Sequence, residues 1–81
     1  MTLLHAATKS LALEVASRGV TVNAVAPGII ATGMVEGSFD AESIRKLVPM
    51  QRAGRPEEVA ELVAFLASDK AAYISGQIIS I

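Results

Sequence analysis

The stretch RGVTVNAVAPG at residues 18–28 decides the fold. Arg18 and Gly19 are helix-end signals, because a cation complements the helix dipole and glycine tolerates the left-handed conformation that often follows a helix. Residues 20–26 are rich in β-branched side chains and carry apolar residues on both faces, which is typical of a buried parallel strand. A Pro-Gly pair then ends the strand. A helix that runs directly into such a strand predicts the α/β class.

The residues on either side continue this alternation of helices and strands. Residues 2–18 carry two adjacent apolar stripes, wide enough to pack on a sheet on one side and on a partner helix on the other. Asp40 is a candidate helix cap, and Pro56, which two glutamates follow, is a helix start. In chain order, the sequence predicts a helix over 2–18, a strand over 20–26, a loop over 29–39, a short helix over 41–47, a helix over 56–67 and a strand over 77–81. Strands joined by a helical crossover are expected to be parallel.

Composition excludes several classes of protein. The chain has 81 residues, of which 52% are apolar and 19% charged, and its formal net charge is −1. This composition excludes a disordered chain, and the charge balance gives no field that would draw the chain onto nucleic acid or anionic lipid. No apolar run reaches the ~18 residues of a membrane span, and without cysteine there is no disulfide framework or thiolate zinc site. We expect a soluble, cytoplasmic protein with no metal site and no nucleic-acid or membrane partner.

Six segments, in this order, resemble those of a known family. They are TKSLALE at 8–14, RGVTVN at 18–23, VAPG at 25–28, PMQRAGRPEEVA at 49–60, FLASD at 65–69 and YISGQ at 73–77. Together they resemble the short-chain dehydrogenase/reductase family from end to end, and within it most closely the 3-oxoacyl-(acyl carrier protein) reductases. The resemblance implies that residues 1–81 are one partial domain. It would be the C-terminal portion of a doubly wound, Rossmann-type parallel sheet, without the N-terminal nucleotide-binding half.

The catalytic Ser and the Tyr-x-x-x-Lys motif of this family have no counterpart in the chain. Tyr73 has no lysine four residues later, and His5 with Lys9 has a similar spacing but the wrong separation from Asn23. We therefore interpret His5 and Lys9 as ordinary helix-surface residues and assign no catalytic residue. The resemblance implies an NAD(P)-dependent enzyme, whereas this chain alone is expected to be inactive.

A Pro-Gly-x-Ile-x-Thr pattern is the part of the family's chemistry that the chain retains. It consists of Pro27, Gly28, Ile30 and Thr32, directly after the predicted strand. Open α/β sheets bind ligands at the carboxyl ends of their strands, and the resemblance implies that these residues contact the nicotinamide side of NADP or NAD. The Ile30 amide and carbonyl would meet the carboxamide, and the Thr32 hydroxyl would bond the carboxamide or the phosphates. Taken by itself, the pattern also fits a plain strand-ending turn.

Residues 29–48 match the variable substrate loop and small helix of the family. Met34, Val35 and Phe39 could line an acyl pocket, although such residues more often only pack. Acyl carrier proteins are acidic, so exposed cations could dock one; a solvated face is the other interpretation. These cations are Arg18, Arg45, Lys46, Arg52 and Arg55.

Two functional hypotheses follow from the resemblance. In the first, the chain is part of an oxidoreductase that reduces a ketone or an acyl-carrier-bound 3-oxoacyl thioester to the hydroxy compound. The chain would supply nicotinamide contacts, the substrate loop and an oligomer helix. In the second, it is a catalytically dead, truncated or pseudo-enzyme chain that acts only as an assembly partner. Family members are usually tetramers, which implies a homo-oligomer built through the helix over 2–18 and the final strand.

Overall fold

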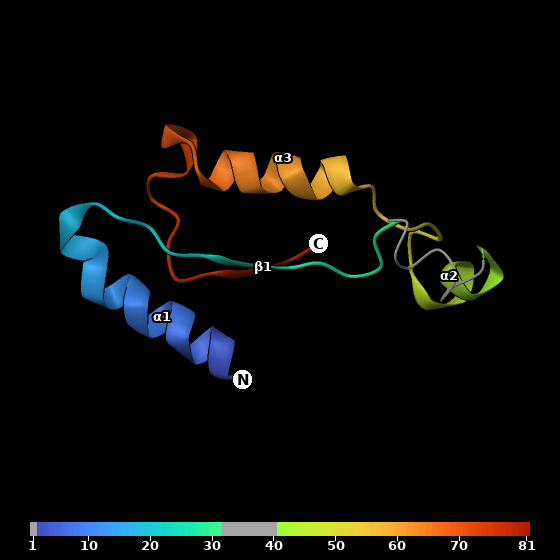
Figure 1. Ribbon diagram of the computed structural model, residues 1–81, viewed down its shortest axis with the longest axis horizontal. Helices are drawn as coiled ribbons and strands as arrows, with labels where there is room; N and C mark the ends of the chain where they lie inside the picture. The colour runs from blue at the N-terminus through green and yellow to red at the C-terminus, as the bar shows by residue number, and fades with distance from the viewer. Residues whose placement is uncertain (1, 32–40) are drawn as a thin grey trace.

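The computed structural model describes residues 2–31 and 41–81. The described elements, in chain order, are α1 (Leu3–Val15), the 3₁₀ turn η1 (Ala16–Arg18), β1 (Ala24–Ala26), α2 (Ala41–Leu47), α3 (Pro56–Leu66), the 3₁₀ turn η2 (Asp69–Ala71) and β2 (Ile78–Ser80). Helices α1 and α3 lie on opposite sides of the strand pair, and α2 lies beyond the end of β1 (Figure 1). The order of elements confirms the predicted α/β class.

The two strands form a parallel pair, as predicted. Ala24, Val25 and Ala26 lie opposite Ile78, Ile79 and Ser80. Backbone hydrogen bonds continue the pairing past both ends, since the Ala24 amide donates to the Gln77 carbonyl at 2.9 Å and the Gly28 amide donates to the Ile81 carbonyl at 2.9 Å. The carboxyl ends of β1 and β2 therefore lie at one edge.

The predicted strand over 20–26 is too long, because regular pairing begins only at Ala24. Opposite residues 22–23 the chain turns at Gly76, whose φ of +72° is incompatible with an extended strand. Side chains take over part of the pairing there. The Val22 amide donates to Ser75 Oγ at 3.1 Å, and the Asn23 side chain bonds the Ile74 carbonyl and the Gln77 amide, each at 3.1 Å. The strand predicted over 77–81 is likewise confined to β2.

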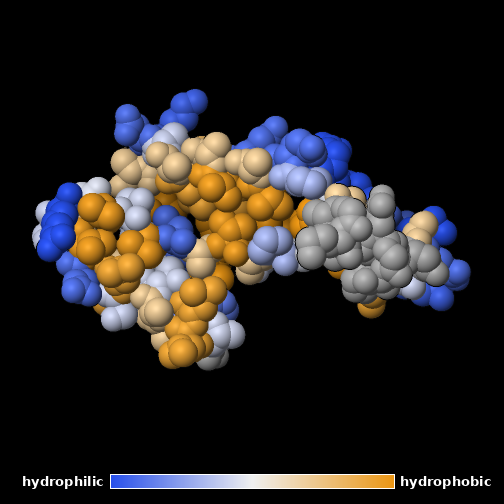
Figure 2. Space-filling view, viewed as in Figure 1, coloured by the Kyte–Doolittle hydropathy of each residue, from blue (hydrophilic) through white to orange (hydrophobic). Residues whose placement is uncertain are grey.

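The first helix follows its sequence signals. Thr2 Oγ1 accepts from the His5 amide at 3.2 Å, and α1 with η1 covers the predicted helix down to Gly19, whose φ is +73°. Thr8 and Ala12 are its buried residues. The wide apolar arc is only partly covered: Leu3 is 87% exposed and Leu13 81%. Apolar surface along α1 is visible in Figure 2.

The two later helices also begin where the sequence predicts. α2 has the predicted bounds, and α3 has Pro56 at its first position. The cap assigned to Asp40 and the loop predicted over 29–39 fall, from residue 32 onward, outside the described residues. Val59, Leu62 and Leu66 of α3 are half-buried. The helix therefore presents a mainly apolar side to the strands.

We expect the isolated chain to show no cooperative thermal transition as a monomer. Among residues 2–31 and 41–81, only Thr8, Ala12 and Ala71 are buried, and no large side chain is. Unfolding therefore exposes little additional apolar surface, which is the source of most folding free energy and of cooperativity. Far-UV circular dichroism during heating, with sedimentation velocity on the same sample, measures this. A sharp transition in a sample that sediments as a monomer would contradict the expectation.

Candidate functional site

The turn that leaves β1 is bound to the end of β2. Besides donating its amide to Ile81, Gly28 lies so close to that residue that an added Cβ would stand 3.4 Å from the Ile81 carbonyl oxygen. That separation leaves a side chain at the limit of ordinary contact. Pro27 has no backbone N–H donor, and its ring fixes its own φ. The direction in which the chain leaves the sheet is therefore constrained on both sides.

Ile30 forms the next fixed point, in an isolated parallel bridge with Gly54. The Gly54 amide donates to the Ile29 carbonyl at 2.9 Å, and the Ala31 amide donates to the Gly54 carbonyl at 2.8 Å. In a parallel bridge, the central residue directs its own amide and carbonyl to the opposite side. Within the described part of the chain, neither group of Ile30 has a hydrogen bond. The Ile30 amide and carbonyl thus offer one hydrogen-bond donor and one acceptor on the same side of the chain.

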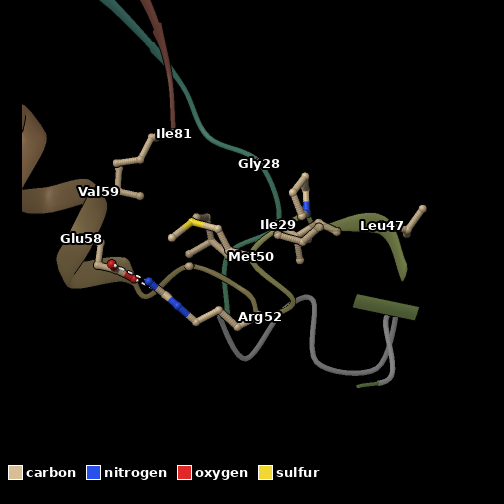
Figure 3. A pocket seen from close by; sticks show the side chains of 12 residues that line it. Gly28, Ile29, Leu47, Met50, Arg52, Glu58, Val59 and Ile81 are labelled. Carbon is tan, nitrogen blue, oxygen red and sulfur yellow. Dashed lines mark hydrogen bonds and ion pairs between the residues drawn. The ribbon is translucent and has the colours of Figure 1, made fainter. Parts of the chain in front are cut away.

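A half-open pocket of about 370 Å³ lies beside this turn (Figure 3). It is formed where the turn after β1, the segment after α2 and the first turn of α3 meet. Most of its lining side chains are apolar, and the exceptions are Arg52 and Glu58. The lining residues are Gly28, Ile29, Ile30, Leu47, Val48, Pro49, Met50, Arg52, Gly54, Glu58, Val59 and Ile81. A pocket with this lining suits an apolar group of a ligand.

Arg52 and Glu58 form a bidentate ion pair at the pocket. Arg52 Nη1 lies 2.8 Å from Glu58 Oε1, and Nη2 lies 3.0 Å from Oε2. Glu58 Oε1 also accepts from the backbone amide of Arg55 at 2.9 Å, which caps the start of α3. Figure 3 shows the Arg52 side chain extended toward the Glu58 carboxylate. One carboxylate thus gathers three hydrogen bonds.

These contacts lower the pKa of Glu58 from its ordinary 4.5 to about 2. The largest cause is the hydrogen bonds from Arg52, followed by the hydrogen bond from the Arg55 amide, because both stabilise the charged carboxylate. The same pairing raises the pKa of Arg52. The Glu58 carboxyl is therefore ionised at neutral pH, as the ion pair requires.

The structure brings together three of the four residues assigned to the cofactor. Pro27, Gly28 and Ile30 lie in one turn at the carboxyl edge of the strand pair, with Pro27 and Gly28 exposed and Ile30 half-buried. The fourth, Thr32, lies outside the described residues. The same holds for the candidate acyl-pocket residues Met34, Val35 and Phe39.

The candidate docking cations have different partners. Arg52 and Arg55 face Glu58, the latter at 4.0 Å, and Lys46 lies 3.4 Å from Glu42 in an exposed pair. For Arg18 and Arg45, no ion pair is found in residues 2–31 and 41–81. Lys9 has a structural contact, since its ammonium group donates to the Gly76 carbonyl at 3.0 Å.

Sequence reasoning missed Gly54 and Glu58. Gly54 enters the site only through its bridge to Ile30, a contact between distant parts of the chain. Glu58 has a local signal that was available, because an acid at the third position of a helix reaches back to the residue that precedes it. Among the described residues, no group of three His, Asp or Glu side chains is placed to hold a metal ion.

We expect Arg52→Gln to raise the pKa of Glu58 from about 2 toward 4.5. A carboxyl group with a lowered pKa in the folded state contributes stability above its unfolded pKa and loses it as the pH falls toward the folded one. The wild-type contribution is therefore lost between about pH 4.5 and pH 2. Carbon-13 NMR titration of the Glu58 carboxyl measures the shift, with Arg45→Gln as the control. Equal midpoints in the wild type and Arg52→Gln would contradict the assignment.

Known proteins are similar to this chain in both sequence and fold. The family model described as enoyl-(acyl carrier protein) reductase matches residues 2–81. A 3-oxoacyl-[acyl-carrier-protein] reductase of Synechocystis sp. is 61% identical over 71 residues, which cover 86% of this chain and 28% of that protein. A glucose and ribitol dehydrogenase homolog of Oryza sativa subsp. japonica is 49% identical over 77 residues, covering 91% of this chain and 26% of that protein.

A solved structure agrees with these sequence matches. A mutant short-chain dehydrogenase/reductase of Serratia marcescens superposes with a TM-score of 0.88 and 38% sequence identity, covering 96% of this chain and 32% of that one. The chain thus spans about a third or less of the length of its relatives. None of the described helices is both long and apolar enough to cross a membrane. The match along nearly the whole chain and the shared fold show that this chain belongs to the short-chain dehydrogenase/reductase family and resembles its 3-oxoacyl-[acyl-carrier-protein] reductases.

Proposed function

We propose that this chain serves in an NAD(P)-dependent oxidoreductase that reduces a ketone or a 3-oxoacyl thioester to the hydroxy compound. Relatives named as 3-oxoacyl-[acyl-carrier-protein] reductases are 61% and 53% identical to it. A relative named as a glucose and ribitol dehydrogenase homolog is 49% identical. The common chemistry of these names is the interconversion of a carbonyl and a hydroxyl group. The proposal therefore covers the reaction, with an acyl-carrier-bound substrate as its narrower form.

The observation that carries the proposal is the peptide geometry at Ile30. Its bridge to Gly54 turns the Ile30 amide and carbonyl away from the neighbouring segment. A nicotinamide carboxamide has one acceptor and one donor group, which match these two backbone groups. Pro27, Gly28 and Ile30 would therefore hold the nicotinamide side of NAD or NADP, together with Thr32. When bound, the cofactor supplies the hydride that reduces the substrate carbonyl.

The neighbouring surface supports an apolar substrate on an acidic carrier. Leu47 is 63% exposed and Met50 76% exposed at the pocket, so both present apolar surface to a ligand. Of the five candidate docking cations, Arg18 and Arg45 are the two for which the described residues show no ion pair, so they are the better candidates for contacts with an acidic carrier protein. The cations bound to Glu42 or Glu58 are partly neutralised.

An alternative function is that of an assembly partner without activity. The observation in its favour is the exposed apolar arc of α1, where Leu3 is 87% and Leu13 81% exposed. A helix face of this kind is normally covered by another helix or a second protein chain. The alternative gives this chain a place in a homo-oligomer or beside a full-length relative, with no turnover of its own.

We expect the purified 81-residue chain to oxidise or reduce no nicotinamide cofactor. It has no Tyr-x-x-x-Lys sequence to donate a proton to a substrate carbonyl. Absorbance at the NADH and NADPH bands, followed with a 3-oxoacyl thioester and with a simple ketone, measures this. The control is the same mixture without protein. Turnover above that background, retained after a second purification step, would contradict the prediction.

A hybrid enzyme tests whether the chain supplies cofactor contacts. In this hybrid, the matching segment of the Synechocystis reductase is replaced by the aligned part of this chain, which is 86% of its length. We expect reduction of a 3-oxoacyl thioester with NADH or NADPH. If the hybrid folds to the oligomeric state of the parent enzyme yet neither binds cofactor nor turns over, the proposed function is wrong.

Within the hybrid, we expect Gly54→Val to raise the KM for the cofactor by about tenfold, or about 1.4 kcal/mol in binding. An added Cβ at Gly54 would stand 2.9 Å from Ile30 Cδ1 and 3.8 Å from the Ile29 carbonyl oxygen. The Ile30 side chain must therefore shift, and the two further methyl groups of valine crowd the bridge. Steady-state kinetics with varied cofactor measures the effect. The control is Ala53→Val, at the preceding residue outside the bridge. Equal KM values for the two variants would argue against a cofactor role of Ile30.

A further inference from the structure

Residues 52–55 are held at both ends by Glu58. Arg52 contributes two hydrogen bonds to its carboxylate, at 2.8 and 3.0 Å, and the Arg55 amide contributes a third at 2.9 Å. Arg52 Nη1 also donates to the Ala53 carbonyl at 3.1 Å, inside the same segment. A single side chain on the first turn of α3 therefore fixes the segment that leads into the helix.

Gly54 lies inside this segment and is the partner of Ile30. Its two bonds, to the Ile29 carbonyl and from the Ala31 amide, are the backbone hydrogen bonds that join the turn after β1 to residues 52–55. Just before the segment, Gln51 has a φ of +62°, a conformation that a non-glycine residue adopts at a cost. The path of residues 52–55 thus depends on the contacts that these residues make, among which the Arg52–Glu58 hydrogen bonds are charge-assisted and bidentate.

We propose that Arg52 and Glu58 are positioning residues for the cofactor, which act by holding Gly54 against Ile30 and so fixing the direction of the Ile30 amide and carbonyl. This inference rests on the proposed function, since it gives the ion pair a part in the same site. Neither side chain needs to touch the cofactor. Their effect passes through the backbone of residues 52–55.

The position and exposure of the Arg52–Glu58 ion pair distinguish a positioning role from a contribution to global stability. The side chains of Arg52 and Glu58 are 46% and 30% exposed, and exposed ion pairs contribute little to global stability. The β1–β2 pairing is maintained by other bonds, such as those from Ala24 to Gln77 and from Gly28 to Ile81. Loss of the ion pair should therefore loosen the Ile30–Gly54 bridge and leave the strand pairing intact.

The test uses Glu58→Gln and Arg52→Gln in the hybrid enzyme. Both variants lose the ion pair, and Glu58→Gln keeps an oxygen that can accept from the Arg55 amide. In both variants we expect the KM for the cofactor to rise about tenfold, with kcat changed less than twofold. We expect Arg52→Lys to give an intermediate KM, because lysine retains the positive charge but cannot form the bidentate hydrogen bonds. The matched control is Glu57→Gln, which removes a carboxylate from the same helical turn and so has a similar effect on the helix dipole.

Amide hydrogen exchange in the same variants provides a second measurement. We expect the Ala31 and Gly54 amides to exchange about tenfold faster in Glu58→Gln, while Ala24 and Gly28 keep their wild-type rates. Equal acceleration at all four amides would show a merely structural role and overturn the proposal. An unchanged KM for the cofactor in both Gln variants would also overturn it.

The two hypotheses fail in distinguishable ways. If the unsubstituted hybrid folds but binds no cofactor, the proposed function is wrong whatever the ion pair does. If the hybrid turns over with its normal KM and that KM is insensitive to Arg52 and Glu58, the positioning role alone is wrong. A tenfold rise in KM in both Gln variants, with Glu57→Gln unaffected, supports both.

Discussion

The parallel pairing of residues 24–28 with residues 77–81 is the constraint on which the rest of the structure depends. It is a long-range contact, and the Asn23–Gln77 hydrogen bond beside it already joins residues 54 positions apart. The pairing brings the carboxyl end of β1 next to the carboxyl end of β2, and the Gly28–Ile81 bond closes that edge. Only with this edge formed does the turn after β1 reach Gly54 and the start of α3. The pocket and the Ile30 peptide are both consequences of it.

The helices could be predicted from sequence because their signals are local. Pro56 marks the start of α3, and Gly19, in the left-handed conformation, marks the end of the first helix. The strand was overpredicted because strand length depends on a partner. Residues 20–23 have strand-forming side chains, but the segment opposite them turns at Gly76. The sequence of residues 20–23 gives no sign of that turn. Once the turn is known, it explains why the Asn23 side chain bonds the Ile74 carbonyl and the Gln77 amide.

The candidate site also contains residues that could be predicted from the sequence and residues that could not. Pro27, Gly28 and Ile30 were predicted from a contiguous motif, and the structure places them in one turn. Gly54 could not be predicted, because its role comes from a bridge across the fold and not from any pattern around it. Sequence alone predicts one docking or solvated surface for the cations of residues 45–55, yet Arg52 belongs to an ion pair with an acid six residues later. That spacing is outside the regular helical pairs, so residue spacing alone does not reveal the contact.

In the described residues, hydrogen bonding is more complete than the burial of apolar side chains. Among the described residues, no buried side-chain nitrogen or oxygen lacks a partner, whereas Leu3 and Leu13 are more than four-fifths exposed. Hydrogen bonds are short-ranged and directional, so a turn held by Gly28–Ile81, Ile30–Gly54 and Arg52–Glu58 can keep its geometry without a large core beneath it. Apolar burial has no such directionality and requires area, which this chain leaves uncovered along α1. The geometry of the candidate site is therefore set by contacts within the chain, whereas the apolar side chains Leu3 and Leu13 of α1 remain exposed.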